Sequence, residues 1–159
     1  MAGLYLHAST GPVALAAAGS NKVFAQINVP ANHRIRIQGV GVFIQGVTVG
    51  DAPCLLKVTR STAGTTPSLS GGVLAKKNNQ DVETPNSAFY NAWVTPPAAG
   101  TLIEEMYVHP QTGIRVFYPT GHEIMVSSDG TATLVAFELT TGNPSTGTPN
   151  ATVEIDYEE

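Results

Sequence analysis

The residues best suited to chemistry in this chain are its four histidines: His7, His33, His109 and His122. A metal-dependent enzyme of the cupin type places two histidines one residue apart on a strand, and no His-x-His pair occurs here. His122 and Glu123 are adjacent, so in a strand their side chains point to opposite faces. Exposed or loop histidines explain this pattern better than metal ligands do, so we predict no metal site and no cofactor.

The remaining reactive residues also lack catalytic spacing. Glu104 and Glu105 alternate in face and cannot flank one glycosidic bond without help from other strands. Glu154 and Asp156 share a face of the last predicted strand, and we interpret that face as solvated. Cys54, the single cysteine, lies in an apolar run and is expected to be a buried structural thiol. The glycine-rich stretch 41–50 lacks the spacing of a phosphate-binding loop, so we predict that the chain is not an enzyme.

The composition is low in charge. Only 13% of the 159 residues are charged, about half the usual share of roughly 25%. Thr, Ser, Asn, Gln, Gly and Ala take the place of Lys and Glu, which suits a surface covered by partners, although a β domain with many turns explains part of it. The net charge is −4 and the basic residues are scattered, so we predict no binding to nucleic acid.

No stretch has the hydropathy of an export signal or of a membrane span. No basic residue precedes Lys22, and polar residues and Pro12 interrupt the apolar residues of the first 19 positions. No run approaches the roughly 18 apolar residues that a spanning helix needs. We expect a protein that is neither exported nor bound to a membrane.

Apolar residues recur with a period of two along almost the whole chain, which predicts strands. The only helix-like composition, residues 13–18, is bounded by Pro12 and Gly19. Nine or ten strands with turn signals every 8–12 residues are typical of an antiparallel sandwich. We therefore predict one domain over residues 1–159 that is all-β, a jelly-roll-like β-sandwich with essentially no helix.

The longest strand pattern, residues 33–45, changes phase in its middle. Ile35 and Ile37 point one way, whereas Val40, Val42 and Ile44 follow in the opposite phase, with Gly39 at the change. One extra residue at a glycine is what a β-bulge introduces. We predict a bulge at Gly39 and a bent strand that serves two sheets.

Asp129-Gly130 stands between two alternating apolar runs, which is a strong hairpin signal. Opposite pairing across this turn gives an apolar face that we assign to the core, made of Ile124, Val126, Val135 and Phe137. The other face of the hairpin is also apolar, and we predict that it is a subunit interface. The predicted interface residues are Met125, Leu134 and Ala136.

The chain resembles the virion proteins of bacteriophages. The residues that carry this resemblance are the opening MAGLYL, the segment RSTAGTTPSLSGG, and the ending HEIMVSSDGTATLVAFEL…TVEIDYEE. It is most similar to the jelly-roll head decoration (cement) proteins of tailed phages, which resemble the trimeric sandwiches of the tumour-necrosis-factor type. No invariant motif carries the resemblance, so no functional residue is transferred by it.

The resemblance implies a homotrimer on the outer surface of the capsid that bridges major capsid subunits and is assembled in the host cytoplasm. For the capsid footprint we predict an N-terminal arm, residues 1–10, together with the loop 60–72. The predicted contact residues are Leu4, Tyr5, Leu6, Thr62, Thr65 and Thr66. The alternative function is a carbohydrate-binding sandwich module that uses exposed aromatic residues: Tyr5, Tyr90, Trp93, Tyr107 and Tyr118.

Overall fold

The structure is a computed structural model, and it describes residues 3–15, 21–46, 53–61, 67–68, 73–78, 80–93, 97, 100–128, 133–140 and 149–159. Sheet A contains seven strands: β1 (Tyr5–Ser9), β2 (Val13–Ala14), β4 (Arg34–Gln45), β7 (Val73–Lys76), β11 (Ile114–Phe117), β12 (Ile124–Ser127) and β14 (Asn150–Glu158). Sheet B contains five: β3 (Asn21–Val29), β5 (Cys54–Ser61), β8 (Ala88–Tyr90), β10 (Thr101–Val108) and β13 (Thr133–Thr140). Two short strands, β6 (Pro67–Ser68) and β9 (Ala92–Trp93), pair with each other.

The eight main strands are connected as a jelly roll. Sheet A contains the order β11-β4-β14-β1 and sheet B the order β10-β5-β13-β3, so the chain crosses between the sheets at almost every step. All pairings are antiparallel, and the described residues contain no helix, which confirms the predicted fold class. Over the described residues the two large sheets contain twelve strands instead of nine or ten, because strands of two or three residues are too short to show a period.

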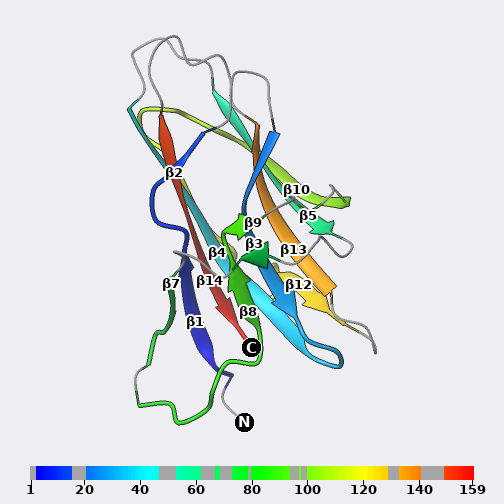
Figure 1. The fold of residues 1–159 in the computed structure, drawn as a ribbon. Coiled ribbons are helices and arrows are strands. Elements are labelled where there is room, and N and C mark those ends of the chain that lie inside the picture. Colours follow the sequence, from blue (N-terminus) through cyan, green and yellow to red (C-terminus); the bar gives the residue numbers. More distant parts are fainter. Residues whose placement is uncertain are drawn as a thin grey trace.

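The core lies between the two sheets, which face each other in Figure 1. Alternate residues of the central strands β14, β4, β13 and β3 point into it. In sheet B the opposite face is covered as well, because Gln26, Ala136 and Glu138 are at most 5% exposed. The largest fully buried side chains include Tyr157, Phe24, Phe137, Leu6 and Ile27. Cys54 is buried in this core at 4% exposure, as its apolar context predicted.

The bulge in β4 is confirmed. Asp156 of β14 pairs with Gly39 and the next residue, Tyr157, pairs with Ile37, so Gln38 is the extra residue. The prediction that this bent strand serves two sheets is wrong. Strand β4 stays in sheet A, where β12 covers the first half of its second edge and β11 covers the other half.

The predicted hairpin between β12 and β13 is wrong, although its core face is right. Strand β12 pairs with β4 in sheet A, whereas both edges of β13 in sheet B are already occupied by β3 and β5. Asp129 and Gly130 themselves lie outside the described residues. The core residues of the two runs therefore meet from opposite sheets, and all are at most 9% exposed: Ile124, Val126, Val135 and Phe137.

The N-terminal arm is also a wrong prediction. Strand β1 lies inside sheet A, between β14 and β7, and Figure 1 shows it in blue beside the red β14. Leu6 is fully buried and Leu4 is 4% exposed, so the apolar residues of this segment belong to the core. Leu4 and Glu159 also exchange two backbone hydrogen bonds, which fix this end of the chain to the end of β14.

Candidate functional site

The outer face of sheet A, the face turned away from sheet B, gathers exposed apolar side chains. Among the described residues, five of the eight exposed large apolar side chains lie on it: Tyr5, Phe43, Val73, Phe117 and Met125. Of the other three, Val82 is in a loop, and Leu102 and Tyr107 are on β10 of sheet B. A concentration of this kind on one sheet face marks a surface suited to contact with another molecule.

Two rows of side chains cross this face in register. One row runs Ala75, His7, Asp156, Gly39, Phe117 over strands β7, β1, β14, β4 and β11. The other, two residues along, runs Val73, Ser9, Glu154, Gly41, Arg115 over the same strands. The rows therefore place Asp156 and Glu154 on the central strand β14. His7 lies on the neighbouring strand β1, and Arg115 lies on β11, two strands away on the other side.

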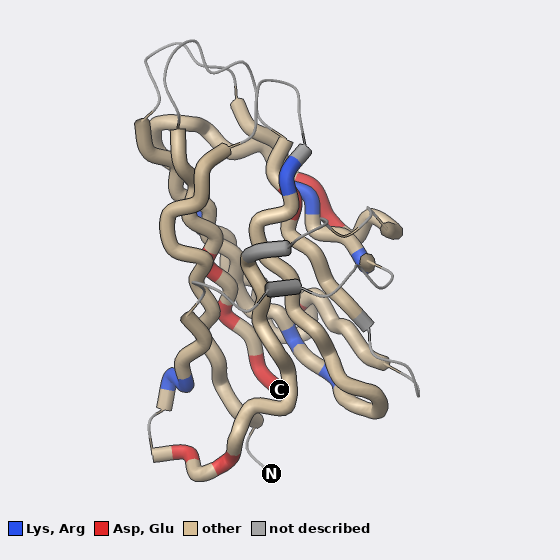
Figure 2. Tube along the Cα trace, viewed as in Figure 1, with Lys and Arg blue, Asp and Glu red and all other residues tan. Residues whose placement is uncertain are grey.

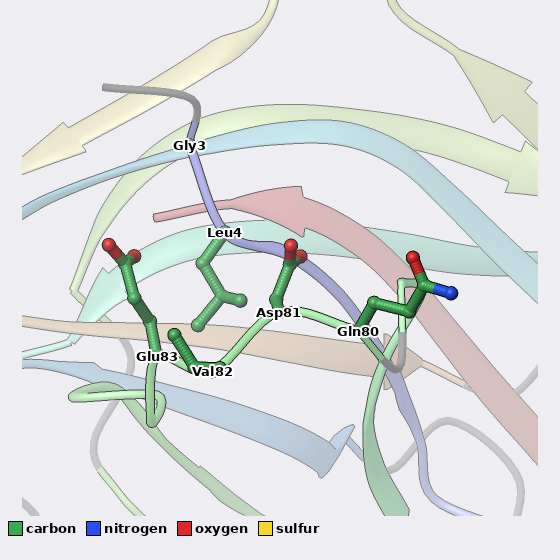
Figure 3. Close-up of a pocket in the computed structure, with 6 residues that line it drawn as sticks. All are labelled: Gly3, Leu4, Gln80, Asp81, Val82 and Glu83. Atoms are coloured by element: carbon green, nitrogen blue, oxygen red, sulfur yellow. The ribbon is translucent and has the colours of Figure 1, made fainter.

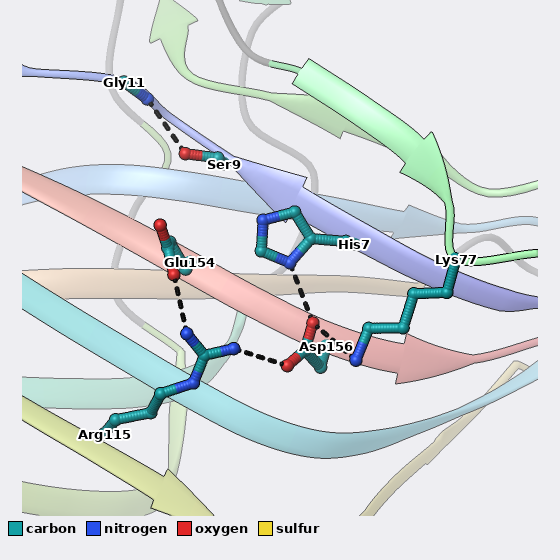
Figure 4. Close-up of polar contacts among 7 residues, drawn as sticks. All are labelled: His7, Ser9, Gly11, Lys77, Arg115, Glu154 and Asp156. Carbon is teal, nitrogen blue, oxygen red and sulfur yellow. Dashed lines mark hydrogen bonds and ion pairs between the residues drawn. The ribbon is translucent and has the colours of Figure 1, made fainter.

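Asp156 is the centre of an ionic network (Figure 4). Its Oδ1 lies 2.8 Å from His7 Nδ1 and 3.0 Å from Lys77 Nζ, and its Oδ2 lies 2.9 Å from an Arg115 guanidinium nitrogen. The second terminal nitrogen of Arg115 donates to Glu154 Oε2 at 3.0 Å. Asp156 is only 3% exposed, although it points away from the core, because these side chains cover it. The interpretation of this strand face as solvated is therefore wrong for Asp156.

The network keeps Asp156 ionised. Burial alone would raise the pKa of its carboxyl, because a low-dielectric surrounding disfavours the charged form. Hydrogen bonds from His7 and Lys77, the charge of Lys77 and the hydrogen bond from Arg115 outweigh burial and hold the pKa of Asp156 below its ordinary value. Both carboxylate oxygens of Asp156 are engaged, Oδ1 by His7 and Lys77 and Oδ2 by Arg115, so neither is free to act as a base. The carboxylate instead holds these side chains in position on the outer face of sheet A.

Gly41 lets Arg115 reach across a whole strand. Arg115 is on β11 and its acidic partners are on β14, with β4 between them. Because Gly41 stands opposite Arg115 and has no side chain, the arginine can pass over β4. Phe43 and Phe117 lie over the glycine backbone as well: a Cβ at Gly41 would come within 3.1 Å of the Phe43 ring, and one at Gly39 within 3.0 Å of the Phe117 ring. The Arg115 guanidinium stacks near Phe117 at 5.1 Å from the ring centroid.

We expect Gly41→Val to weaken this arrangement. The new side chain displaces Phe43 and stands between Arg115 and Glu154, at a cost of about 1–2 kcal/mol, typical of overpacking. Urea unfolding of Gly41→Val, Arg115→Met and the double variant measures the effect. If Gly41 serves the reach of Arg115, the Arg115→Met change costs clearly less in the Gly41→Val background; additive losses would contradict this role.

The predicted interface residues do not form one face. Met125 points outward from sheet A and is 51% exposed. Leu134 and Ala136 point outward from sheet B, on the opposite side of the sandwich, and Ala136 is 2% exposed within its own subunit. The prediction that these three residues share one face depended on the hairpin between β12 and β13. It is wrong because β12 and β13 belong to different sheets. A role for Met125 in a subunit contact remains a prediction.

The predicted capsid contacts of the N-terminal segment differ in exposure. Tyr5 lies on the outer face of sheet A and is 40% exposed, whereas Leu4 and Leu6 are buried and are not available to a partner. Thr62, Thr65 and Thr66 lie outside the described residues. No local pattern groups His7, Lys77 and Arg115, because the segments that bring them to Asp156 are far apart in the sequence.

Two adjoining hollows lie at the end of the sandwich where Leu4 meets Glu159. One, of about 260 Å³, is lined by Gly3, Leu4, Gln80, Asp81, Val82 and Glu83, and Figure 3 shows its acidic side chains on either side of Leu4. The other, of about 430 Å³, is lined by Leu4, His33, Glu83, Thr84, Asn86 and Glu159. The Glu159 carboxylate already accepts hydrogen bonds from Asn86 and Ser87. In the described residues, no group of three or more His, Cys, Asp or Glu is placed to hold a metal ion.

Comparison with protein-family models, with curated proteins and with solved structures finds no match for this chain. The described residues include no helix with the length and hydropathy that a membrane span requires. The function must therefore be argued from the jelly roll and from the outer face of sheet A.

Proposed function

We propose that this chain is a structural virion protein, a homotrimeric decoration (cement) protein on the outside of a tailed-phage head. The observation that carries the proposal is the gathering of exposed apolar side chains on the outer face of sheet A. Subunits meet through this face, with Phe117 and Met125 among the contacts. The jelly-roll fold and the resemblance to phage virion proteins support the same assignment.

The charges on this face suit a second copy of the chain as its occupant. Basic and acidic side chains there nearly balance: Arg34, Arg36, Lys77 and Arg115 against Glu154, Asp156 and Glu158. The whole chain has a net charge of −4, so copies repel elsewhere but hardly at this face. Figure 2 shows that charged residues are sparse along the trace. On the outer face of sheet A, Asp156, Lys77, Arg115 and Glu154 already pair with one another within the subunit, which lowers the cost of removing water from them when copies associate.

A rigid trimer stabilises a capsid by avidity. Three weak footprints on one body bind the major capsid protein far more tightly than one does, provided that the lattice presents matching sites. Binding to the mature lattice and not to its precursor stabilises the shell by mass action. With Leu4 and Leu6 buried, the proposed capsid footprint keeps Tyr5 and the predicted loop residues Thr62, Thr65 and Thr66.

The carbohydrate-binding alternative receives less support from the placement of the tyrosines. Tyr5 and Tyr107 lie on opposite sheets. Tyr118 is half-buried and donates to Glu104 at 2.5 Å, and burial together with the hydrogen bond and charge of Glu104 raises the pKa of Tyr118 above its ordinary value. These side chains form no common platform for a sugar ring. A glycan array that returned specific ligands would favour this alternative over the decoration protein.

Light scattering of the purified protein tests the proposal directly. We expect a particle of about three times the 16.6 kDa mass of one chain, stable on dilution to micromolar concentration. Added to phage heads that lack it, the protein should co-sediment with them and raise the temperature at which they release DNA. A monomer at all concentrations would remove the proposal, and a trimer that ignores capsids would remove the capsid as partner.

A further inference from the structure

We propose that His7 makes the association of subunits dependent on pH, so that protonation of its imidazole loosens the assembly. This inference rests on the proposed function, because it concerns the same outer face of sheet A. His7 belongs to the network that this face would bury, because its Nδ1 lies 2.8 Å from Asp156 Oδ1 (Figure 4). Histidine is the side chain that ordinarily changes charge between pH 5 and 8.

The charged groups around His7 come from β14, from the residue after β7 and from β11. Strand β14 contributes Glu154, Asp156 and Glu158, the residue after β7 is Lys77, and β11 contributes Arg115. Glu158 pairs in register with Arg36 and accepts from Gln38 at 3.5 Å. In the row of His7 itself, β4 contributes Gly39 and β7 contributes Ala75, and neither side chain is charged. On β1 itself, Tyr5 is the titratable residue that shares the face.

The balance of these charges decides the direction of the effect. With neutral His7, the hydrogen-bonded group contains two cations, Lys77 and Arg115, and two carboxylates, Asp156 and Glu154. Protonated His7 adds one positive charge that no further carboxylate compensates. In the separate subunit this charge is tolerated, because the His7 side chain is 31% exposed to water and still donates to Asp156.

Association of subunits makes a charged His7 less favourable. A second subunit on the face removes the water around His7, and burial disfavours the charged form of an imidazole. Around a symmetry axis, each subunit also brings the same extra charge. Association therefore favours neutral His7, and by linkage a fall in pH favours separate subunits. The low pKa of Asp156 means that its carboxylate stays ionised over this range and does not cause the change.

The test is the dissociation constant of the oligomer, measured by analytical ultracentrifugation at steps between pH 8.0 and pH 5.0. For the unmodified chain we expect a rise of at least about tenfold towards pH 5.0, equivalent to about 1.4 kcal/mol. His7→Gln, which cannot gain a charge, should keep a tight and nearly constant value. His7→Arg, which is always charged, should associate weakly even at pH 8.0. His122→Gln, at an exposed position outside the strands, is the matched control and should behave as the unmodified chain.

Each other outcome contradicts a stated part of the proposal. An oligomer with a constant dissociation constant, or one that tightens at pH 5.0, overturns the role of His7 and leaves the trimer in place. So does a His7→Gln oligomer that keeps the full pH dependence. A chain that is monomeric at every pH overturns the proposed function itself. Circular dichroism at each pH verifies that the subunit stays folded, so that dissociation is not mistaken for unfolding.

Discussion

Replacing Phe117 by lysine is expected to split the trimer into folded monomers. Phe117 is 62% exposed on the outer face of sheet A, and its ring lies over Gly39 and not in the core. A lysine there places an ammonium beside Arg115, and covering it with a second subunit leaves that charge without a partner. We expect association to weaken by at least about 100-fold, or about 2.7 kcal/mol. Light scattering over a dilution series measures the change.

Tyr107→Lys is the matched control for this experiment. Tyr107 is also an exposed aromatic residue on a strand, at 74% exposure, but it lies on β10 of sheet B. Its replacement should leave the oligomer intact. A Phe117→Lys protein that stays trimeric while remaining β-rich by circular dichroism would show that subunits meet through another surface. Dissociation by Tyr107→Lys alone would place that surface on sheet B.

Asp156→Asn is expected to cause the largest loss of subunit stability among the residues of the network. The amide keeps the shape of the side chain but removes the charge that Lys77 and Arg115 share. Removing one member of a buried ionic group costs about 3–5 kcal/mol when its partners are also buried. Because Lys77 and Arg115 are partly exposed and can turn to water, we expect about 2–3 kcal/mol at pH 7.

The cost should depend on pH with a definite sign. The pKa of Asp156 is lower in the folded protein than in the unfolded chain, so its stabilisation is complete above about pH 5 and declines as the pH falls below about 4. Urea unfolding at pH 7 and pH 2 measures the difference between the two proteins. The difference should be smaller at pH 2, because the charge of Asp156 is lost as the pH falls through its lowered folded-state pKa; an equal difference at both values would contradict the ionic explanation.

Glu154→Gln is the control on the same strand face. Its side chain is 26% exposed and pairs only with Arg115 among the described residues. Partly exposed pairs of this kind contribute about 0–1 kcal/mol, so the loss should be clearly smaller than for Asp156→Asn. If Glu154→Gln lost more stability than Asp156→Asn, Glu154 and not Asp156 would be the main acceptor of the network.

Local periodicity determined which face of a strand points into the core. The alternation in residues 33–45 located a bulge at Gly39, and the register of β4 against β14 has its extra residue beside it. The two runs around residues 124–139 predicted their core residues correctly. Both successes have one cause: a strand exposes alternate side chains to opposite faces, whichever strand it pairs with.

The pairing of strands was decided by the tertiary structure. The Asp129-Gly130 signal predicted a local hairpin, but β13 has both edges occupied by β3 and β5, so β12 pairs with β4. In a jelly roll most neighbouring strands are distant in sequence. Strand β1 pairs with β14, for example, and this buries Leu4 and Leu6 of the predicted arm.

By itself, then, the sequence determined an all-β sandwich, its core positions and its low charge, because these follow from composition and a period of two. Only the tertiary structure decided which outward side chains meet. His7, Lys77, Arg115 and Asp156 come from four segments, and no local pattern relates them. Gly41 is an example of this limit. It matters because it leaves space for Arg115, which is 74 positions away in sequence but lies opposite it on the neighbouring strand.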